Sequence, residues 1–296
     1  MLTLAIPNYN GARFLSETLV SLQRNSPNVR WYLQDAGSTD GSLEIAGRHA
    51  SASDVIVVEP DAGQADGLNR AMSHMGGDVI GFLNSDDLLA DNAAERILEE
   101  LARDSSVDLV YGEVDWIDEH GHNTGHHSGE LSALSDVLDI YKVWWNGRQW
   151  VQPEVFWRRR VWEQVGAFDT RYELAFDYDY WVRCFRKQVK VKKIPHTLAK
   201  FRLHRAQKSS NAGKAAIEIR TIVAKSLSDP NLPYWPGKSQ LERMLAFDYY
   251  QSGQRYPDGR RPSLLSMVLR HPGWLYVPEV RRRVGSKIRR LWNIGT

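Results

Sequence analysis

Two acidic clusters are the residues of this chain best suited to chemistry. The first is Asn-Ser-Asp-Asp at 84–87, directly after the apolar run 79–83, and the second contains Asp177 and Asp179. A strand that ends in such residues places hard oxygen ligands at the mouth of a sheet, where Mg²⁺ or Mn²⁺ can bridge carboxylates and a substrate diphosphate. The pattern therefore predicts a divalent metal site and a separate carboxylate base.

The elements that must position these residues alternate between strand and helix. Strands are expected at 2–6, 29–33, 54–58, 79–83 and 108–111, and helices at 14–24, 42–49, 65–73 and 92–103, the last with Asp91 as N-cap. Repeated strand–helix units predict an α/β fold with a doubly wound parallel sheet, whose ligands bind at the carboxyl ends of the strands. The polar segments 7–11, 35–41, 61–64 and 84–87 all fall at those ends.

The pattern changes after Tyr111. We expect a hairpin around His120, helices at 159–165 and 176–187, strands at 189–194 and 197–203, and a helical region at 213–253. An apolar helix face is predicted from Ile217, Ile219, Ile222, Val223 and Leu227. The predicted organisation is one domain at 1–210, with halves 1–111 and 112–210, followed by a helical C-terminal region at 211–296.

Composition places the chain among globular proteins. It has 296 residues, 42% hydrophobic and 25% charged, and none of its apolar runs approaches the roughly 20 residues of a membrane span. The N-terminus begins a strand at once, without the pattern of a secretory signal, and Cys184 is the only cysteine. These features predict a cytoplasmic protein with Cys184 packed in a helix.

The net charge of +2 conceals a basic C-terminus. From Arg255 onward there are ten Lys and Arg against two carboxylates, a net charge of +8 that leaves −6 for residues 1–254. On a helix, the segment 277–292 carries an apolar stripe flanked by arginines, which predicts peripheral binding to an anionic membrane surface, such as the inner face of the membrane. The alternative is a solvated helix packed on its own domain. No companion motif indicates a nucleic-acid partner.

Some enzyme classes are disfavoured by the loops. No Gly-x-Gly-x-x-Gly follows the first strand and no P-loop is present, which argues against dinucleotide oxidoreductases and P-loop NTPases. The segment 35–41 alone is weak evidence, because an ordinary strand-to-helix turn has the same composition.

Several segments together are more specific. They are Pro7–Gly11, Asp35–Gly41, Asp61–Asn69, Gly81–Asp87, Gln152-Pro153, Val165–Asp169 and Asp177–Arg183, in that order. Over about residues 1–210 the chain resembles glycosyltransferase family 2, the inverting enzymes of the GT-A fold. That resemblance implies a Rossmann-like, mostly parallel sheet with a mixed C-terminal part and a helical extension.

The resemblance also implies roles for single residues. Those expected around the nucleotide-sugar are Pro7, Tyr9, Asn10, Asp35, Ser38, Asp61, Gln64, Asn69, Asn84 and Ser85. Asp86, Asp87 and His204 would hold Mn²⁺ or Mg²⁺, although a histidine near a strand end is often an ordinary surface residue. Asn84 departs from the family pattern, which has an aspartate at this position, but the family tolerates this departure, and Asn can hydrogen-bond ribose or a metal-bound water.

Asp177 occupies the position of the family's base, with Asp179 as the fallback. The two do not share a helix face, since they are two residues apart, and either could instead be an N-cap. Acceptor contacts are expected from Gln152, Trp150 and Trp181, near Trp144 and Trp145, although large aromatic residues are more often core. His126 and His127 are expected in a loop without metal.

The sequence thus predicts an inverting hexosyltransferase that uses a nucleotide-diphospho-sugar, with UDP the favoured nucleotide. The acceptor would be a glycan or lipid-linked glycan in bacterial surface polysaccharide synthesis, such as lipopolysaccharide. Non-processive transfer is expected because the chain lacks the transmembrane helices and Gln-x-x-Arg-Trp segment of processive synthases. The alternatives are a sugar-1-phosphate nucleotidylyltransferase, for which 7–13 offers few basic residues, and a catalytically degenerate GT-A scaffold, suggested by Asn84.

Overall fold

The structure is a computed structural model that describes residues 1–208, 211–261, 263 and 268. The chain divides into two compact units, 1–215 and 216–296, whereas the predicted boundary lay at 210. The tail at 277–292, predicted to lie on a membrane surface, falls outside the described residues. Within the described part of the chain, no helix has the length and hydropathy of a membrane span.

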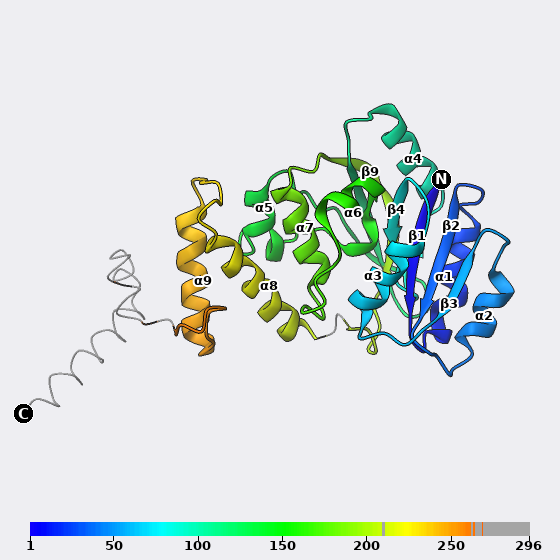
Figure 1. Ribbon diagram of the computed structural model, residues 1–296, viewed down its shortest axis with the longest axis horizontal. Helices are drawn as coiled ribbons and strands as arrows, with labels where there is room; N and C mark the ends of the chain where they lie inside the picture. The colour runs from blue at the N-terminus through cyan, green and yellow to red at the C-terminus, as the bar shows by residue number, and fades with distance from the viewer. Residues whose placement is uncertain (209–210, 262, 264–267, 269–296) are drawn as a thin grey trace, which may run out of the picture. The chain divides into compact units, whose positions relative to one another are not determined.

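Strands and helices alternate through the first half of the chain, as the sequence predicts (Figure 1). In order they are β1 (Leu2–Asn8), α1 (Ala12–Gln23), β2 (Val29–Asp35), α2 (Ser42–His49), β3 (Val55–Val58), α3 (Gln64–His74), β4 (Val79–Phe82), β5 (Leu88–Leu89) and α4 (Ala93–Arg103). There follow β6 (Leu109–Ile117), β7 (Asn123–His127), α5 (Leu134–Leu138), β8 (Val155–Arg158), α6 (Arg159–Val165), α7 (Phe176–Arg186), β9 (Val191–Arg202), α8 (Ala212–Leu227) and α9 (Lys238–Ser252). Short 3₁₀ turns form at Trp144–Asn146 and Gln152–Glu154.

The described strands form one mixed sheet. Its order is β3-β2-β1-β4-β8-β6-β9-β5, with β7 paired to β6. The neighbours β3, β2, β1 and β4 are parallel, β8 is antiparallel to both β4 and β6, and β9 is parallel to β6. Four parallel strands with intervening helices bring the loops after β1, β2, β3 and β4 to one edge of the sheet.

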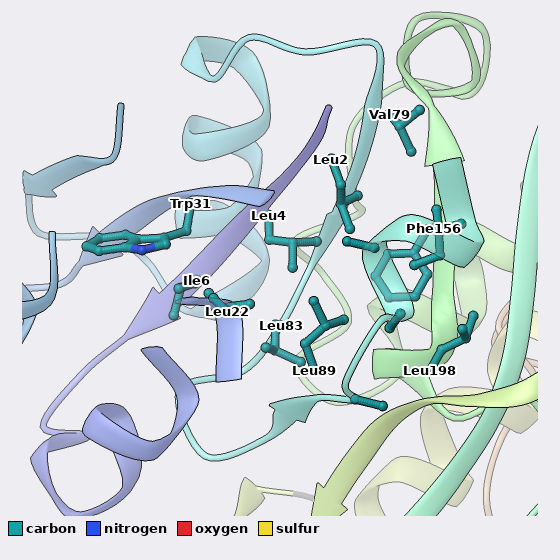
Figure 2. Packing of buried hydrophobic residues seen from close by; sticks show 14 of the residues in the cluster. Leu2, Leu4, Ile6, Leu22, Trp31, Val79, Leu83, Leu89, Phe156 and Leu198 are labelled. Atoms are coloured by element: carbon teal, nitrogen blue, oxygen red, sulfur yellow. The ribbon is translucent and has the colours of Figure 1, made fainter. Parts of the chain in front are cut away.

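Alternating side chains of β1 explain how the sheet is covered. Leu2, Leu4 and Ile6 project into one cluster with Leu15 and Leu19 of α1, and Figure 2 shows part of this packing around Phe156. Because side chains alternate along a strand, the other face of β1 is left for α3, which packs on β1 and β2. Right-handed crossovers on both sides of β1 produce this arrangement.

Two consecutive arginines fasten helices to the centre of the sheet. Arg158, at the end of β8, donates to the Leu101 and Val107 carbonyl oxygens at 2.5 and 2.8 Å, beside the C-terminus of α4. Arg159 donates to the Met75 and Gly77 carbonyl oxygens at 2.6 and 2.7 Å, beyond the C-terminus of α3. Cations at helix C-terminal carbonyls satisfy acceptors that the helix itself leaves open.

Local corrections have physical reasons. The two strands predicted at 189–194 and 197–203 are one strand, β9, because its pairing with β6 shifts register around Pro195 and then resumes. Helix α4 begins after Asn92, at φ 60°, and its Ala94 N–H is satisfied by Asn25 Oδ1 at 3.1 Å rather than by Asp91. His126 and His127 lie in strand β7 rather than in a loop.

Helix α8 buries Ile219, Ile222 and Val223, as predicted, but leaves Ile217 exposed. Residues 217 and 219 are two apart on a helix and therefore point in different directions. The region predicted as helical at 213–253 consists of two helices, α8 and α9.

Glu154 is a fully buried carboxyl group between the 3₁₀ turn and β8. Its Oε1 accepts a hydrogen bond from the Val151 N–H at 2.9 Å, while Oε2 has no partner among the described residues. Burial raises the pKa of Glu154 well above its ordinary value of 4.5, and the nearby Lys193 only partly opposes this effect.

The raised pKa predicts a pH-dependent stability. The neutral form of Glu154 stabilises the fold fully below pH 4.5, and this contribution is lost as the pH rises through the folded-state pKa. Glu154→Gln should therefore raise the melting temperature more at pH 8 than at pH 5, as measured by thermal unfolding. Glu130→Gln, at an exposed glutamate, is the control; the same pH dependence in both variants would contradict the explanation.

Candidate active site

The loops after β1 and β2 are joined by a buried carboxylate. Asp35, which has no exposed surface, accepts from Asn8 Nδ2 and Ser38 Oγ at 2.6 Å each, and from the Gly37 and Ser38 N–H groups. Its oxygens are thus used to shape the loop. The expected contact of Asp35 with a nucleotide stays a prediction.

A second clasp connects the same loops at the surface. Asn10, at φ 53°, donates its N–H to Ser38 Oγ at 2.8 Å, and its Oδ1 accepts the Thr39 N–H at 2.9 Å. Between Pro7 and Asn10 the ring of Tyr9 is exposed. The predicted residues of this loop therefore divide: Asn10 and Ser38 hold the backbone, and Tyr9 presents an aromatic face.

The loop after β3 is built around Asp61. Its Oδ1 accepts the Gly63 N–H at 2.9 Å, and a Cβ at position 67 would lie 2.5 Å from its Oδ2. Only glycine at 67 allows helix α3 to pass so close to this carboxylate. The first residue of α3, Gln64, points across to Asn84, with Nε2 to Oδ1 at 2.7 Å.

Asn69 has a structural role that the sequence did not indicate. Its carboxamide donates to the Phe168 carbonyl at 3.0 Å and accepts the Phe168 N–H at 2.8 Å. Both polar atoms of the Asn69 side chain therefore bond to a residue that lies 99 positions later in the sequence. The residue ties α3 to the segment before α7, and its expected contact with the nucleotide-sugar stays a prediction.

The acidic strand end after β4 separates into inward and outward residues. Asp87 is buried and accepts from the Arg202 N–H at 2.9 Å and from Asn84 Nδ2 at 3.2 Å. Asp86 is partly exposed, and its Oδ2 lies 2.9 Å from His204 Nε2. The structure thus brings together Asp86 and His204, separated by 118 residues, but turns Asp87 into the protein.

Arg202 holds this corner together. Its side chain is 0% exposed, and it donates to the Asp86 carbonyl at 2.9 Å and to Glu17 Oε2 at 2.8 Å. The guanidinium also lies 4.7 Å from the centroid of the Phe14 ring, and that ring lies 4.8 Å from the His204 ring. We assigned no role to Arg202 or Phe14 from the sequence. A cation between Phe201 and Leu203 in a strand pattern was the available signal.

The electrostatics agree with these positions. Burial, and then the neighbouring Asp86 carboxylate, raise the pKa of Asp87 well above its ordinary value. The Asp87 carboxyl group is turned inward, where it accepts from the Arg202 N–H and from Asn84 Nδ2, and its expected metal role stays a prediction.

One carboxylate and one imidazole lie side by side at this corner, with the Asp86 side chain 28% exposed and the His204 side chain 7% exposed. Asp86 and His204 form an oxygen and nitrogen donor pair of the type that accepts Mn²⁺, whereas Mg²⁺ prefers oxygen alone. Among the described residues there is no group of three or more His, Cys, Asp or Glu suited to a metal ion. The residues present thus fit a cation that takes its remaining ligands from a substrate or from water.

Helix α7 carries both predicted base residues in its first turn. Asp179 pairs with Arg183 at 2.8 Å, and Arg183 also donates to the Val165 and Ala167 carbonyl oxygens. Asp177 Oδ1 accepts the Tyr178 N–H at 2.7 Å. The carboxylate of Asp179 is therefore committed to anchoring the loop before α7.

The predicted acceptor tryptophans are in the core. Trp150 and Trp181 are 3% and 1% exposed, with ring centroids 5.6 Å apart, so neither offers a face to a substrate. This corrects their assignment, since large aromatic rings are stabilised most by complete burial. Trp145 is the exposed tryptophan of this segment, at 41%, with its ring 5.4 Å from that of Tyr141. Gln152 is buried and donates to the Phe82 carbonyl at 2.7 Å.

The fold is that of the GT-A glycosyltransferases. TarS of S. aureus, solved with UDP-GlcNAc, matches with a TM-score of 0.61 and 14% identity over 84% of this chain and 72% of that one. The mannosyltransferase PcManGT of Pyrobaculum calidifontis, solved with GDP-Man and Mn²⁺, matches with a TM-score of 0.60 and 18% identity over 99% of this chain and 87% of that one. At such identities the likeness establishes the fold alone.

The chain belongs to glycosyl transferase family 2, whose sequence model matches residues 3–180. A PGL/p-HBAD biosynthesis glycosyltransferase of Mycobacterium tuberculosis is 29% identical over 67% of this chain and 75% of its own length. Hyaluronan synthase of Pasteurella multocida is 25% identical over 79% of this chain, but only 24% of that enzyme is covered. The family and fold predicted from the sequence are thus confirmed.

The opposite orientations of Asp86 and Asp87 can be tested by stability. Asp87→Ala should lower the free energy of unfolding by roughly 1–3 kcal/mol, because it leaves the buried Arg202 N–H and Asn84 amide without an acceptor. Asp86→Ala should cost much less, since the side chain is partly exposed and its bond to His204 is made at the rim of the site. Urea unfolding in EDTA measures both without any metal contribution. Equal losses would contradict the assignment of Asp87 as the inward residue.

Proposed function

We propose that this protein is an inverting glycosyltransferase that transfers a sugar from a nucleotide-diphospho-sugar to a glycan or lipid-linked glycan. The observation that carries the proposal is the meeting of Asp86 and His204 at 2.9 Å, at the edge of the sheet where the loops after β1 to β4 converge. An anionic diphosphate with a divalent cation is the ligand that this donor pair suits.

The donor side is formed by the first four loops. Tyr9 offers an exposed aromatic face on which a base can stack, and we propose that Pro7, Asp61, Gln64 and Ser85, at or near the ends of β1, β3 and β4, contribute to the same nucleotide-sugar site. TarS was solved with UDP-GlcNAc and PcManGT with GDP-Man, which supports a nucleotide-sugar for this chain as well. UDP remains the proposed nucleotide, with GDP as the alternative that a binding assay distinguishes.

Mn²⁺ is the proposed cofactor, with Mg²⁺ as the alternative, and Asp86 and His204 are the residues that would hold it. When bound, a divalent cation supplies the positive charge that stabilises a departing diphosphate. The protein's own groups would orient the donor. Arg202 holds Asp86 in place by donating a hydrogen bond to its backbone carbonyl, and the Phe14 ring packs against His204.

Asp177 is the proposed base. Inversion requires a carboxylate on the acceptor side to take the proton of the attacking hydroxyl group. Asp179, paired with Arg183, is better placed to position α7 than to accept a proton. The exposed ring of Trp145 and the nearby Tyr141 lie in the segment before Gln152, and we propose this aromatic pair, in place of Trp150 and Trp181, as a contact for the acceptor sugar.

The acceptor and the cellular role are proposals from the family. Named relatives include a PGL/p-HBAD biosynthesis glycosyltransferase and a hyaluronan synthase, which supports addition of sugars to a lipid-linked or polysaccharide acceptor. Non-processive hexosyl transfer in surface polysaccharide synthesis, with residues 277–292 on an anionic membrane, remains the proposal for this chain.

Hydrolysis of a panel of UDP- and GDP-sugars, with Mn²⁺, with Mg²⁺ and with EDTA, tests the function. We expect release of one nucleoside diphosphate that depends on the metal. If the protein binds neither UDP nor GDP under any of these conditions, the scaffold alternative is correct. Release of pyrophosphate from a nucleoside triphosphate and a sugar-1-phosphate would instead identify a nucleotidylyltransferase.

Asp177→Asn should lower kcat at least about a hundredfold while the Kd of the donor stays nearly unchanged, because the amide can hold a hydroxyl group but cannot take its proton. Asp179→Asn should mainly lower the melting temperature, since it weakens the pair with Arg183. Steady-state kinetics and calorimetric titration of the donor separate the two effects. A larger loss of kcat in Asp179→Asn would move the base to that residue.

A further inference from the structure

We propose that Asn84 is a positioning residue whose carboxamide links the donor-side loop to the acceptor-side residue Gln152, and that an amide is required at this position. The inference rests on the proposed function and deepens it. It concerns the position at which the chain departs from the family's aspartate, and it explains why a carboxylate does not stand there.

Asn84 is the junction of a chain of amide hydrogen bonds. Its Oδ1 accepts from Gln64 Nε2 at 2.7 Å, and its Nδ2 donates to Gln152 Oε1 and to Asp87 Oδ2, at 3.2 Å each. Gln152 Nε2 continues the chain to the Phe82 carbonyl at 2.7 Å. This series of hydrogen bonds therefore runs from the first residue of α3, across the end of β4, to Gln152 in the 3₁₀ turn before β8.

The direction of these bonds is fixed at both ends. The Phe82 carbonyl can only accept, so Gln152 must turn Nε2 toward it and Oε1 toward Asn84. Gln152 Oε1 can then only accept, so Asn84 must present its NH₂ group to it, and the same NH₂ group also reaches Asp87 Oδ2 at 3.2 Å. Only Oδ1 remains for Gln64, which then has to donate.

An aspartate at position 84 would conflict with Gln152. One of its oxygens would face Gln152 Oε1 at the 3.2 Å distance of the present hydrogen bond, with no hydrogen atom between them. Asp87 is held by the Arg202 N–H, and Gln152 cannot turn without losing the Phe82 carbonyl. A carboxylate beside Asp86 and Asp87 would also add like charge.

Residues 84–87 would therefore have different roles in the site. Asp86 is the carboxylate that faces outward, and Asn84 sets the distance between the donor loop and the acceptor side. Gln64 and Gln152 each form a hydrogen bond with Asn84, which therefore connects them. A change at Gln152 should therefore alter nucleotide binding only while Asn84 is present.

Calorimetric titration of UDP and GDP with Mn²⁺ tests the requirement for an amide. Asn84→Asp restores the aspartate of the family pattern, yet we expect it to weaken binding of the preferred nucleotide about tenfold, no less than Asn84→Ala. If the position were simply a weakened metal ligand, Asn84→Asp would bind the nucleotide with Mn²⁺ more tightly than the wild type. That result would overturn the proposal.

Asn25 provides a matched control. It is also buried, its Nδ2 donates to the Ser21 and Ala90 carbonyl oxygens at 3.0 Å, and its Oδ1 accepts the Ala94 N–H at 3.1 Å. Asn25→Asp loses the same donors away from the site, so it should lower the melting temperature and leave the nucleotide Kd unchanged. A Kd shift of similar size in Asn25→Asp would mean that the effect at 84 is one of stability alone.

A double-mutant cycle tests the link itself. Gln64→Ala and Gln152→Ala should change the nucleotide Kd non-additively in the wild type, by about threefold or more, and additively when Asn84 is alanine. Additive effects in both backgrounds overturn the proposal, even if Asn84→Asp fails to fold. A wild-type protein that binds neither UDP nor GDP with Mn²⁺ would overturn the proposed function as well, so the two failures are distinguishable.

Discussion

The guanidinium of Arg202 is a charge without exposed surface, and the corner of the sheet that carries the site is arranged around it. A buried cation costs several kcal/mol unless its hydrogen bonds are satisfied. Here Glu17 supplies the opposite charge, the Asp86, Asp118 and Glu119 carbonyl groups accept the remaining N–H groups, and the Phe14 ring lies beneath. These partners come from α1, from the turn after β4 and from the β6–β7 hairpin. The requirement to pair one charge thus fixes three segments relative to β9.

The same constraint places the Asp86–His204 pair. His204 stands two residues after Arg202, so the bonds that hold Arg202 also bring the imidazole to Asp86. The backbone N–H of Arg202 additionally fixes Asp87, which leaves Asp86 as the carboxylate that faces outward. A site on the surface is therefore built on a buried framework, and its geometry does not depend on flexible loops alone.

Much of the scaffold could be predicted from the sequence. Apolar runs separated by amphipathic helices specified β1 to β4, and the helices at 42–49 and 159–165 have the predicted bounds. The convergence of Asp86 and His204 also followed, but only from the family resemblance, since no local pattern relates residues 118 apart. Composition alone cannot tell an inward carboxylate from an outward one. Asp35, Asp87 and Asn69 look like ligand-binding residues because polar side chains at strand ends are needed equally for closing loops.

The buried tryptophans illustrate the same ambiguity for apolar surfaces. Trp150 and Trp181 pack with Trp157 and Tyr180 into an aromatic core behind α7, and this core, rather than an acceptor groove, accounts for the tryptophan-rich segment. Its function is positional. Ring packing in this core anchors helix α7, which carries Asp177. Arg183 of α7 also donates to the Val165 and Ala167 carbonyl groups. Asn69 of α3 bonds to Phe168 in the same loop, so the loop connects α7 to α3. The proposed base and the donor-side helix are therefore joined through one set of hydrogen bonds and ring contacts, and such a connection is what holding a proton acceptor at a fixed distance from a bound donor requires.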